Sequence, residues 1–277
     1  MTLDLSFPPP PASHQLTGRA AIVTGAVSGI GLAMVQCLAD RGASVLAVDV
    51  GDPVPSLDET AHFDGQVRYE RTDVTSADDL DKAVDTCLEG FGTVDMLFNN
   101  AGITRASFAH EMSEDDWRLV LDVDLTAVWL GSKAVLPQMM QQGRGAIVNT
   151  ASTLGLIAQH LMPSYVAAKS GVVGLTRQLA LDYGRHGIRT NCICPGPTKT
   201  PNVARSYERE GTMTARGQYL LDSVPLGRMA DPSEIAAAAI FLASDDASFV
   251  NGAVLVVDGG HSMHTGPTWN QTHFDEG

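Results

Sequence analysis

The chain has 277 residues, 44% of them hydrophobic, and its 18 basic against 32 acidic residues give a formal net charge of -14. This length suits one large domain with a substantial core, and the negative charge argues against nucleic acid or an anionic membrane as a partner. No apolar run reaches the ~18 residues of a membrane span, and no Lys or Arg precedes Arg19 as a secretory signal would require, so we expect a cytoplasmic protein.

The two ends of the chain differ in composition from the rest. Residues 8–11 are consecutive prolines, typical of an extended polyproline-like segment. We expect a flexible arm over residues 1–17, one domain over residues 18–260, and a tail over residues 261–277 that is flexible or reaches a neighbouring subunit.

Between these ends, short apolar segments alternate with longer amphipathic ones. The apolar segments are nearly continuous, which indicates parallel strands covered on both faces by helices. We therefore predict an α/β fold with a single doubly wound domain around seven parallel strands. Strands are expected at 20–24, 44–49, 67–71, 95–99, 146–150, 188–194 and 253–258, and helices at 28–41, from 76, at 113–141 with Pro137 near the end, at 163–185 and from 231.

A glycine-rich segment, TGAVSGIG, lies between the first strand and the first helix (24–31). Gly25, Gly29 and Gly31 would let main-chain N–H groups and the helix N-terminus approach a pyrophosphate, although a tight strand-to-helix turn would also explain them. Asp49 ends the next strand, near the position of an acid that binds adenosine ribose hydroxyls. Its carboxylate would repel a 2′-phosphate, which favours NAD over NADP.

Tyr165 and Lys169 are four positions apart in YVAAK. On a helix they would share one face, although a surface pair with no function would show the same pattern. A neighbouring ammonium would lower the tyrosine pKa from its ordinary value near 10, so that the phenol could exchange a proton near neutral pH.

The four cysteines do not suggest a metal site. No C-x-x-C pair occurs, and no second pair complements Cys192 and Cys194. We expect buried free thiols and no bound metal.

Several motifs occur in a fixed order: TGAVSGIG, NNAG (99–102), Ser152, YVAAK (165–169) and PGPTKT (195–200). Together they resemble the classical short-chain dehydrogenase/reductase family over about residues 17–260. The resemblance implies a seven-stranded Rossmann fold, a nicotinamide cofactor, a secondary alcohol or ketone as substrate, and a homotetramer.

The resemblance also implies a role for each matching residue. Ser152 should hydrogen-bond the substrate oxygen, Tyr165 should be the general acid/base, and Lys169 should bind the nicotinamide ribose and lower the tyrosine pKa. Asp73 and Val74 should meet the adenine, residues 99–102 should line the wall beside the adenosine ribose, and residues 195–200 should hold the nicotinamide end. The full set expected to contact the cofactor is Gly25, Ser28, Gly29, Ile30, Gly31, Asp49, Asp73, Val74, Asn99, Asn100, Ala101, Gly102, Tyr165, Lys169, Pro195, Gly196, Thr198 and Thr200.

Asp124 departs from the family pattern, which usually has an asparagine there that completes a catalytic tetrad. The family uses the main-chain carbonyl of that residue to hold a water next to the active-site lysine. An aspartate is therefore either a tolerated near-isostere or a residue that retunes the proton relay.

Three interpretations of the function follow. The first is an NAD-dependent oxidoreductase acting on a moderately hydrophobic alcohol or ketone, because Leu154, Ile157, Leu161 and Met162 are apolar, or on a sugar if Gln159 and His160 point inward. The second is a 3-ketoacyl-carrier reductase, since NNAGITR is similar to that group, although Asp49 and the acidic surface disfavour it. The third is a non-catalytic NAD-binding protein, disfavoured by the presence of Ser152, Tyr165 and Lys169.

Overall fold

A central parallel sheet organises the molecule. The computed structural model describes residues 16–58, 66–201, 203, 208–209 and 212–263. Seven strands lie in the order β3-β2-β1-β4-β5-β6-β9, all pairs parallel, which confirms the predicted doubly wound α/β fold. The strands are β1 Ala20–Thr24, β2 Ser44–Asp49, β3 Val67–Arg71, β4 Met96–Asn99, β5 Gly145–Thr150, β6 Ile188–Pro195 and β9 Val254–Val257.

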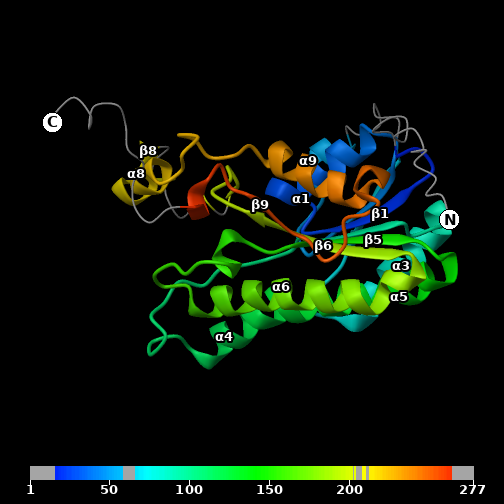
Figure 1. The fold of residues 1–277 in the computed structure, drawn as a ribbon, viewed down its shortest axis with the longest axis horizontal. Coiled ribbons are helices and arrows are strands. Elements are labelled where there is room, and N and C mark those ends of the chain that lie inside the picture. The colour runs from blue at the N-terminus through cyan, green and yellow to red at the C-terminus, as the bar shows by residue number, and fades with distance from the viewer. Residues whose placement is uncertain (1–15, 59–65, 202, 204–207, 210–211, 264–277) are drawn as a thin grey trace, which may run out of the picture.

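Helices cover both faces of this sheet. Figure 1 shows α1 (Gly29–Ala39) and α9 (Pro232–Ala243) on one side, and α3 (Ala77–Phe91), α4 (Glu114–Leu121), α5 (Ala127–Gln142) and α6 (Pro163–Tyr183) on the other. Alternate residues of β1 enter separate cores: Ala21 and Val23 pack under α1 and α9, whereas Ala20 and Ile22 pack against α3 and α5. Because both faces are covered, an inner strand such as β1 is apolar throughout instead of alternating, whereas the edge strand β3 (VRYER) is only partly buried.

Local sequence signals fix the helix ends. Ser76 caps α3 by accepting a hydrogen bond from the Asp79 N–H, and Gly92 ends it at φ 77°. Asp231 and Glu234 form a capping box at the start of α9, with Pro232 at its first position. These residues explain why the predicted starts of both helices are confirmed.

The predicted helical stretch over residues 113–141 is confirmed, but its middle is not α-helical. The structure has α4, then a π-helical segment, η2 (Asp122–Thr126), and then α5. Pro137 lies within α5, whose C-cap is Gly143 at φ 66°. A π-helical turn accommodates one extra residue per turn, and here it contains Asp124, which is completely buried.

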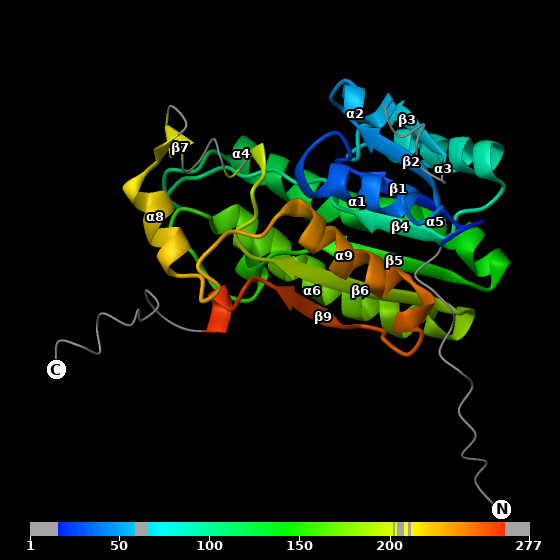
Figure 2. The same ribbon diagram turned by 90° about the horizontal axis from the view of Figure 1, so that it is seen from above.

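Short elements that the sequence did not predict surround the sheet. They are α2 (Pro55–Asp58), η3 (Thr153–Gly155), η4 (Gly184–His186), β7 (Glu208–Arg209), β8 (Thr212–Met213), α8 (Ala215–Asp222), η5 (Asp245–Ala247) and η6 (His261–Met263). Figure 2 views the sheet from above, with α8 beyond the carboxyl ends of the strands. Among the described residues, no helix has the length and apolarity needed to cross a membrane.

The packed domain extends slightly past the predicted boundaries. Leu16 is buried in the core, and its N–H donates to the Arg41 carbonyl. At the other end, His261 Nδ1 lies 2.9 Å from Ser223 Oγ at the end of α8. The predicted arm before residue 16 and tail after residue 263 lie outside the described residues.

Candidate active site

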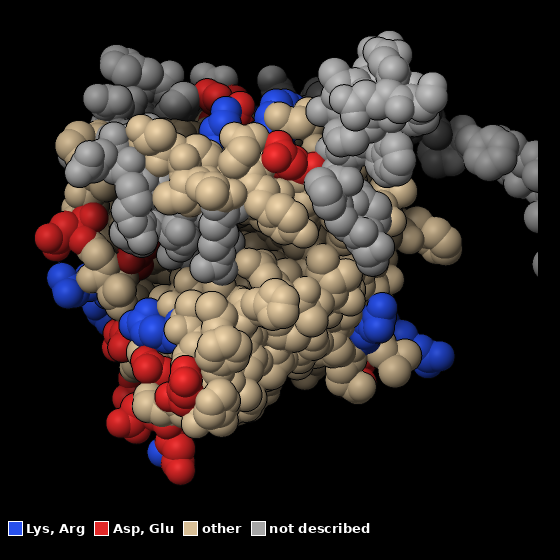
Figure 3. Space-filling view, turned by 90° about the vertical axis from the view of Figure 1, so that its left-hand side faces the viewer, with Lys and Arg blue, Asp and Glu red and all other residues tan. Residues whose placement is uncertain are grey.

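The carboxyl ends of β1, β4, β5 and β6 bring the sequence motifs together. The residues after these strands are the glycine-rich loop, residues 99–102, Ser152 and residues 195–200. Figure 3 looks onto this end of the molecule, where the described surface beside a central hollow is largely uncharged. This edge is where ligands bind in open α/β sheets.

The glycine-rich loop is pressed against the end of β4. A Cβ on Gly25 would lie 2.8 Å from Ala101 Cα, and one on Gly31 would lie 2.0 Å from the Gly25 carbonyl oxygen. Thr24 Oγ1 accepts hydrogen bonds from the N–H groups of Asn100 and Ala101, at 2.9 and 3.0 Å. Close packing therefore requires two of the predicted glycines, Gly25 and Gly31.

The start of α1 has the properties of an anion site. Ser28 occupies the N-cap but its exposed hydroxyl makes no capping hydrogen bond, and the first turn, which includes Gly29, Ile30 and Gly31, contains no acidic residue. The first N–H groups of a helix need partners, and a pyrophosphate supplies them. Gly29 has φ +53°, and Thr200 packs against it, with Cγ2 3.0 Å from the position of a Cβ.

Asp49 is fixed at the end of β2. Its Oδ2 accepts from the Val27 N–H at 3.2 Å and its Oδ1 from the Gly51 N–H at 2.9 Å. These bonds hold a half-buried carboxylate next to the glycine-rich loop, where the sequence placed the ribose-binding acid.

The expected cofactor wall over residues 99–102 divides into two parts. Asn100 lies beside the loop, with Nδ2 3.1 Å from the Thr24 carbonyl oxygen. The Asn99 side chain points elsewhere: its Nδ2 donates to Asn149 Oδ1 at 2.9 Å and to Ser132 Oγ at 3.3 Å, beneath the sheet. Only the main chain of Asn99 can therefore face the wall.

The expected adenine contacts are held at the end of β3. Asp73 is exposed, and its Oδ1 accepts from the Thr75 N–H and hydroxyl at 2.9 and 2.7 Å. Val74 is buried against Leu80 and Ala127.

Ser152, Tyr165 and Lys169 converge after β5 and at the start of α6. Lys169 Nζ lies 5.6 Å from the centre of the Tyr165 ring, so the predicted shared helix face is confirmed. Nζ also donates to the Thr150 carbonyl oxygen at 3.0 Å. Ser152 is buried and accepts from the Leu154 N–H at 3.1 Å, and its hydroxyl acts to lower the pKa of the Tyr165 phenol.

Asp124 joins this group from η2. Its Oδ2 lies 3.2 Å from Lys169 Nζ, and its Oδ1 accepts from the Ile103 N–H at 2.8 Å. Burial raises the pKa of Asp124 above its ordinary value, while Lys169 and the Ile103 N–H act in the opposite direction. Burial acts to lower the pKa of Lys169, but Asp124 and Tyr165 outweigh it and the net shift is upward.

The expected effect of Lys169 on the Tyr165 pKa has the predicted direction, but burial outweighs it and the net shift is upward. Burial raises the pKa of Tyr165 above 10, Lys169 opposes this, and Asp124 adds to the increase. The prediction from YVAAK considered only the ammonium of Lys169, and the carboxylate of Asp124 was considered separately as a residue that could retune the proton relay. The structure places both charges near the phenol, so their effects on its pKa partly cancel.

The segment after β6 is held by Ala230, which lies just before α9. The N–H of Lys199 donates to the Ala230 carbonyl, and the N–H of Ala230 donates to that of Pro197, each at 2.9 Å. Thr198 is buried with Oγ1 3.0 Å from the Gly196 carbonyl oxygen, so its side chain supports the turn. Pro195 is the last residue of β6 and pairs with Val257.

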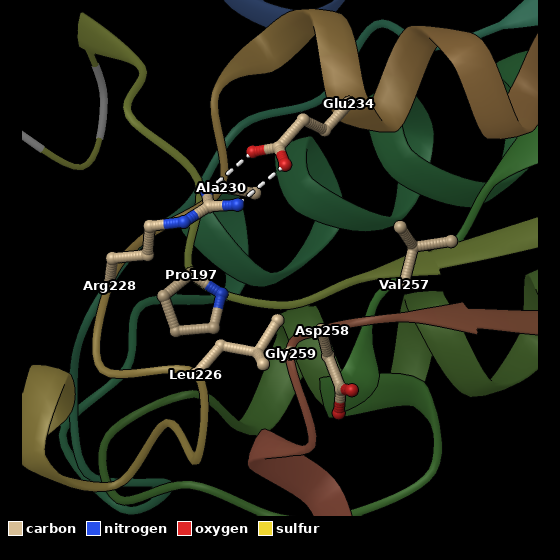
Figure 4. Close-up of a pocket in the computed structure, with 8 residues that line it drawn as sticks. All are labelled: Pro197, Leu226, Arg228, Ala230, Glu234, Val257, Asp258 and Gly259. Carbon is tan, nitrogen blue, oxygen red and sulfur yellow. Dashed lines mark hydrogen bonds and ion pairs between the residues drawn. The ribbon is translucent and has the colours of Figure 1, made fainter.

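A small recess behind this segment has a supporting role. Figure 4 shows Arg228 holding Glu234 through two hydrogen bonds of 2.6 and 2.7 Å. Asp258 Oδ1 and Oδ2 accept from the N–H groups of Gly260 and Ser262. The charged groups of the recess, Arg228, Glu234 and Asp258, thus have hydrogen-bond partners within the protein. The recess is lined by Pro197, Leu226, Arg228, Ala230, Glu234, Val257, Asp258 and Gly259.

Thr24 and Leu161 also shape the site, although no motif predicted a role for either residue. Thr24 anchors residues 100–101, and its place before Gly25 could have indicated this. Leu161 has φ 67°, the one positive value outside glycine among the described residues, and its carbonyl accepts from the Ser107 N–H at 2.9 Å. Such a conformation costs on the order of 1–2 kcal/mol, and no sequence pattern revealed it.

Comparisons with known proteins agree with this arrangement. The family model described as enoyl-(acyl carrier protein) reductase matches residues 25–262. The cis-4-hydroxycyclohexanecarboxylate dehydrogenase of Sinomonas cyclohexanicum is 44% identical over 250 residues, covering 88% of this chain and 96% of the relative. The cyclohexanol dehydrogenase of Acinetobacter sp. (strain SE19) is 38% identical over 253 residues, covering 90% and 97%.

Solved structures show the same fold. Levodione reductase superposes with a TM-score of 0.83 at 36% identity, covering 90% of this chain and 99% of that one. A putative 2-deoxy-D-gluconate 3-dehydrogenase from Agrobacterium tumefaciens, with bound NADP, gives 0.82 at 37% identity, covering 90% and 98%. The chain therefore belongs to the short-chain dehydrogenase/reductase family and is an oxidoreductase acting on CH–OH groups.

Proposed function

We propose that this chain is an NAD-dependent dehydrogenase that interconverts an alicyclic secondary alcohol and its ketone. The observation that carries the proposal is the convergence of Ser152, Tyr165 and Lys169 at the carboxyl end of β5, with Lys169 Nζ 5.6 Å from the tyrosine ring. This edge also contains the start of α1 and Asp49, which fit the pyrophosphate and ribose of a dinucleotide.

The chain supplies the proton chemistry. The Ser152 hydroxyl, held by the Leu154 N–H, would orient the substrate oxygen, and the Tyr165 phenolate would accept the hydroxyl proton during oxidation. Lys169, held by the Thr150 carbonyl, would stabilise that phenolate and bind the nicotinamide ribose. When bound, NAD supplies the acceptor for the hydride.

The preference for NAD rests on Asp49. Its carboxylate, fixed by Val27 and Gly51, would accept hydrogen bonds from ribose hydroxyls and repel a 2′-phosphate. Arg71 lies in register with Asp49, but its guanidinium pairs with Asp52 at 3.5 Å. Because Asp52 already pairs with Arg71, this arginine is less available to bind the 2′-phosphate of NADP.

The substrate class rests on the surface beyond Ser152 and on the relatives. Leu156 and Ile157 are exposed apolar residues just after η3, and the described surface around the hollow at this end is largely uncharged. The two relatives described above act, by name, on cyclohexanol and on a hydroxylated cyclohexanecarboxylate. A compact apolar ring with a secondary hydroxyl suits such a surface.

The test is NADH formation from NAD with cyclohexanols, an acyclic diol, a sugar and a 3-hydroxyacyl thioester. Tyr165→Phe should lower kcat by at least about 100-fold while cofactor still binds, since general acid–base catalysis contributes that much. Tyr183→Phe, at the far end of the same helix, is the matched control. NAD binding without turnover of any compound would support a non-catalytic NAD-binding protein, and NADPH-dependent reduction of an acyl thioester would support a 3-ketoacyl reductase.

We also propose a homotetramer. Large apolar side chains are exposed on the helices of both faces, including Trp117 and Trp129 on α4 and α5 and Phe241 on α9. Light scattering of the purified chain measures its mass, and a monomer would refute the assembly.

A further inference from the structure

A buried ion pair lies within the proposed catalytic group. Asp124 Oδ2 is 3.2 Å from Lys169 Nζ, and the two side chains are 0% and 3% exposed. A carboxylate buried to this degree is strongly unfavourable unless a positive charge compensates it. The two residues belong to different elements, η2 and α6, so the pair depends on the tertiary structure.

The pair is fixed from several sides. Asp124 Oδ1 accepts from the Ile103 N–H at 2.8 Å, and Lys169 Nζ donates to the Thr150 carbonyl at 3.0 Å. A Cβ on Gly102 would lie 3.0 Å from Asp124 Oδ2 and 3.4 Å from Nζ, so the main chain is packed directly over the two charges. Exclusion of water lowers the local dielectric constant and strengthens their effect on neighbouring groups.

An asparagine at position 124 would have nearly the same shape but no charge. Its side-chain oxygen could still accept from the Ile103 N–H, yet the ammonium of Lys169 would lose its counter-charge. The difference between the two residues at this position is therefore mainly electrostatic.

We propose that Asp124 is a positioning residue that holds the Lys169 ammonium and cancels part of its charge, so that Tyr165 works in a site with almost no net charge. The inference rests on the acid/base role proposed for Tyr165. It predicts that proton transfer by this enzyme needs more alkaline conditions than it would with an uncharged residue at position 124.

Burial is the largest influence on the Tyr165 pKa, which it raises, and four groups act beside it, three on named elements and Ser152 just before η3. Lys169 on α6 lowers the Tyr165 pKa, whereas Asp124 on η2 and Cys194 on β6 raise it; Ser152 lowers it through a hydrogen bond. Without the negative charge of Asp124, the lowering effect of the Lys169 ammonium on the Tyr165 pKa is opposed less strongly. The phenolate should then form at lower pH.

The test compares Asp124→Asn with Asp122→Asn, which removes the same charge from an exposed position in the same π-helical segment. Phenolate absorbance is titrated against pH in the wild type and in each variant. The same titration is repeated with Tyr165→Phe added to each, and the difference isolates the signal of Tyr165 from the other tyrosines among the five. Asp124→Asn should lower the pH midpoint of Tyr165 by about one unit, as expected when a charge near a titrating group is removed. Asp122→Asn should match the wild type.

This measurement does not require turnover, so it remains informative even if no alcohol in the substrate panel is oxidised. Where a substrate is found, the acidic limb of its kcat/KM profile should move in parallel with the titration. Identical phenolate signals in wild type and Asp124→Asn across the folded pH range would overturn the proposal. If Asp124→Asn does not fold, Asp124→Ser takes its place, and failure of both to fold would show a structural role and overturn the proposal as well.

Discussion

The side-chain amide of Asn99 donates to Asn149 Oδ1 over 2.9 Å, and the two residues are register partners on β4 and β5. Asn149 Nδ2 in turn donates to Thr176 Oγ1 at 3.0 Å on α6. This buried chain of hydrogen bonds joins the sheet to the helix that contains Tyr165 and Lys169.

Asn99→Ala should therefore lower the free energy of unfolding more than it affects cofactor binding. It leaves the Asn149 oxygen without its donor, and a buried polar group in this state costs about 1–3 kcal/mol. Urea unfolding measures the loss, and titration with NAD measures affinity. A large loss of NAD affinity at unchanged stability would instead support a direct contact between the Asn99 side chain and the cofactor.

Asp49→Ser should shift the cofactor preference toward NADP. The change removes the carboxylate that would repel a 2′-phosphate, with Arg71 close by in register. We expect the ratio of kcat/KM for NAD to that for NADP to fall at least tenfold, equivalent to about 1.4 kcal/mol. Asp85→Ser removes an equal charge from an exposed position on α3 as a control. An unchanged ratio would show that Asp49 does not select the cofactor.

Arg189→Gln should destabilise the end of α9. The Arg189 guanidinium donates to the carbonyls of Leu242, Ala243 and Ser244 at 2.6, 3.1 and 2.8 Å, which are among the last acceptors of that helix. Charged hydrogen bonds contribute about 1.5–3 kcal/mol each in favourable settings, so a total loss of about 2–4 kcal/mol is expected in urea unfolding. The exposed Arg185→Gln serves as the control, and equal stability of both variants would contradict this role.

Glu234 should make stability depend on acidic pH. Its hydrogen bonds with Arg228 and with the Asp231 N–H lower its pKa from 4.5 to about 2. A folded pKa below the unfolded one means that the contribution is complete above about pH 4.5 and is lost as the pH falls toward 2. The stability difference between wild type and Glu234→Gln should thus shrink on acidification into that range. Urea unfolding at several pH values in this range measures the stability difference, with Glu89→Gln at an exposed position as control. A stability difference that does not change with pH would contradict the lowered pKa of Glu234.

Local features of the sequence were sufficient to predict the architecture. Seven segments of strand length, most of them apolar, are separated by capped amphipathic helices and allow few arrangements other than a doubly wound parallel sheet. Glycines and caps such as Gly92 and the Asp231–Glu234 pair act within a few residues of their own position. For this reason the strands and most helix starts were predicted within one or two residues.

The least predictable parts were those that depend on packing between distant segments. The π-helical turn at Asp122–Thr126 lies within a stretch with a helical pattern, and it contains Asp124, which contacts Lys169 and the Ile103 N–H from other parts of the chain. The positive φ of Leu161 and the buried orientation of Asn99 similarly depend on neighbours that are remote in the sequence.

The sequence by itself determined the fold, the order of the motifs and the shared helix face of Tyr165 and Lys169, because helix and strand periodicities are local properties. The tertiary structure decided the electrostatics of the site. A phenol beside an ammonium suggests a lowered pKa, but burial and the carboxylate of Asp124 reverse its direction. Charge–charge energies depend on distance and on exclusion of water, and both are set only when η2, α6 and the end of β5 pack together.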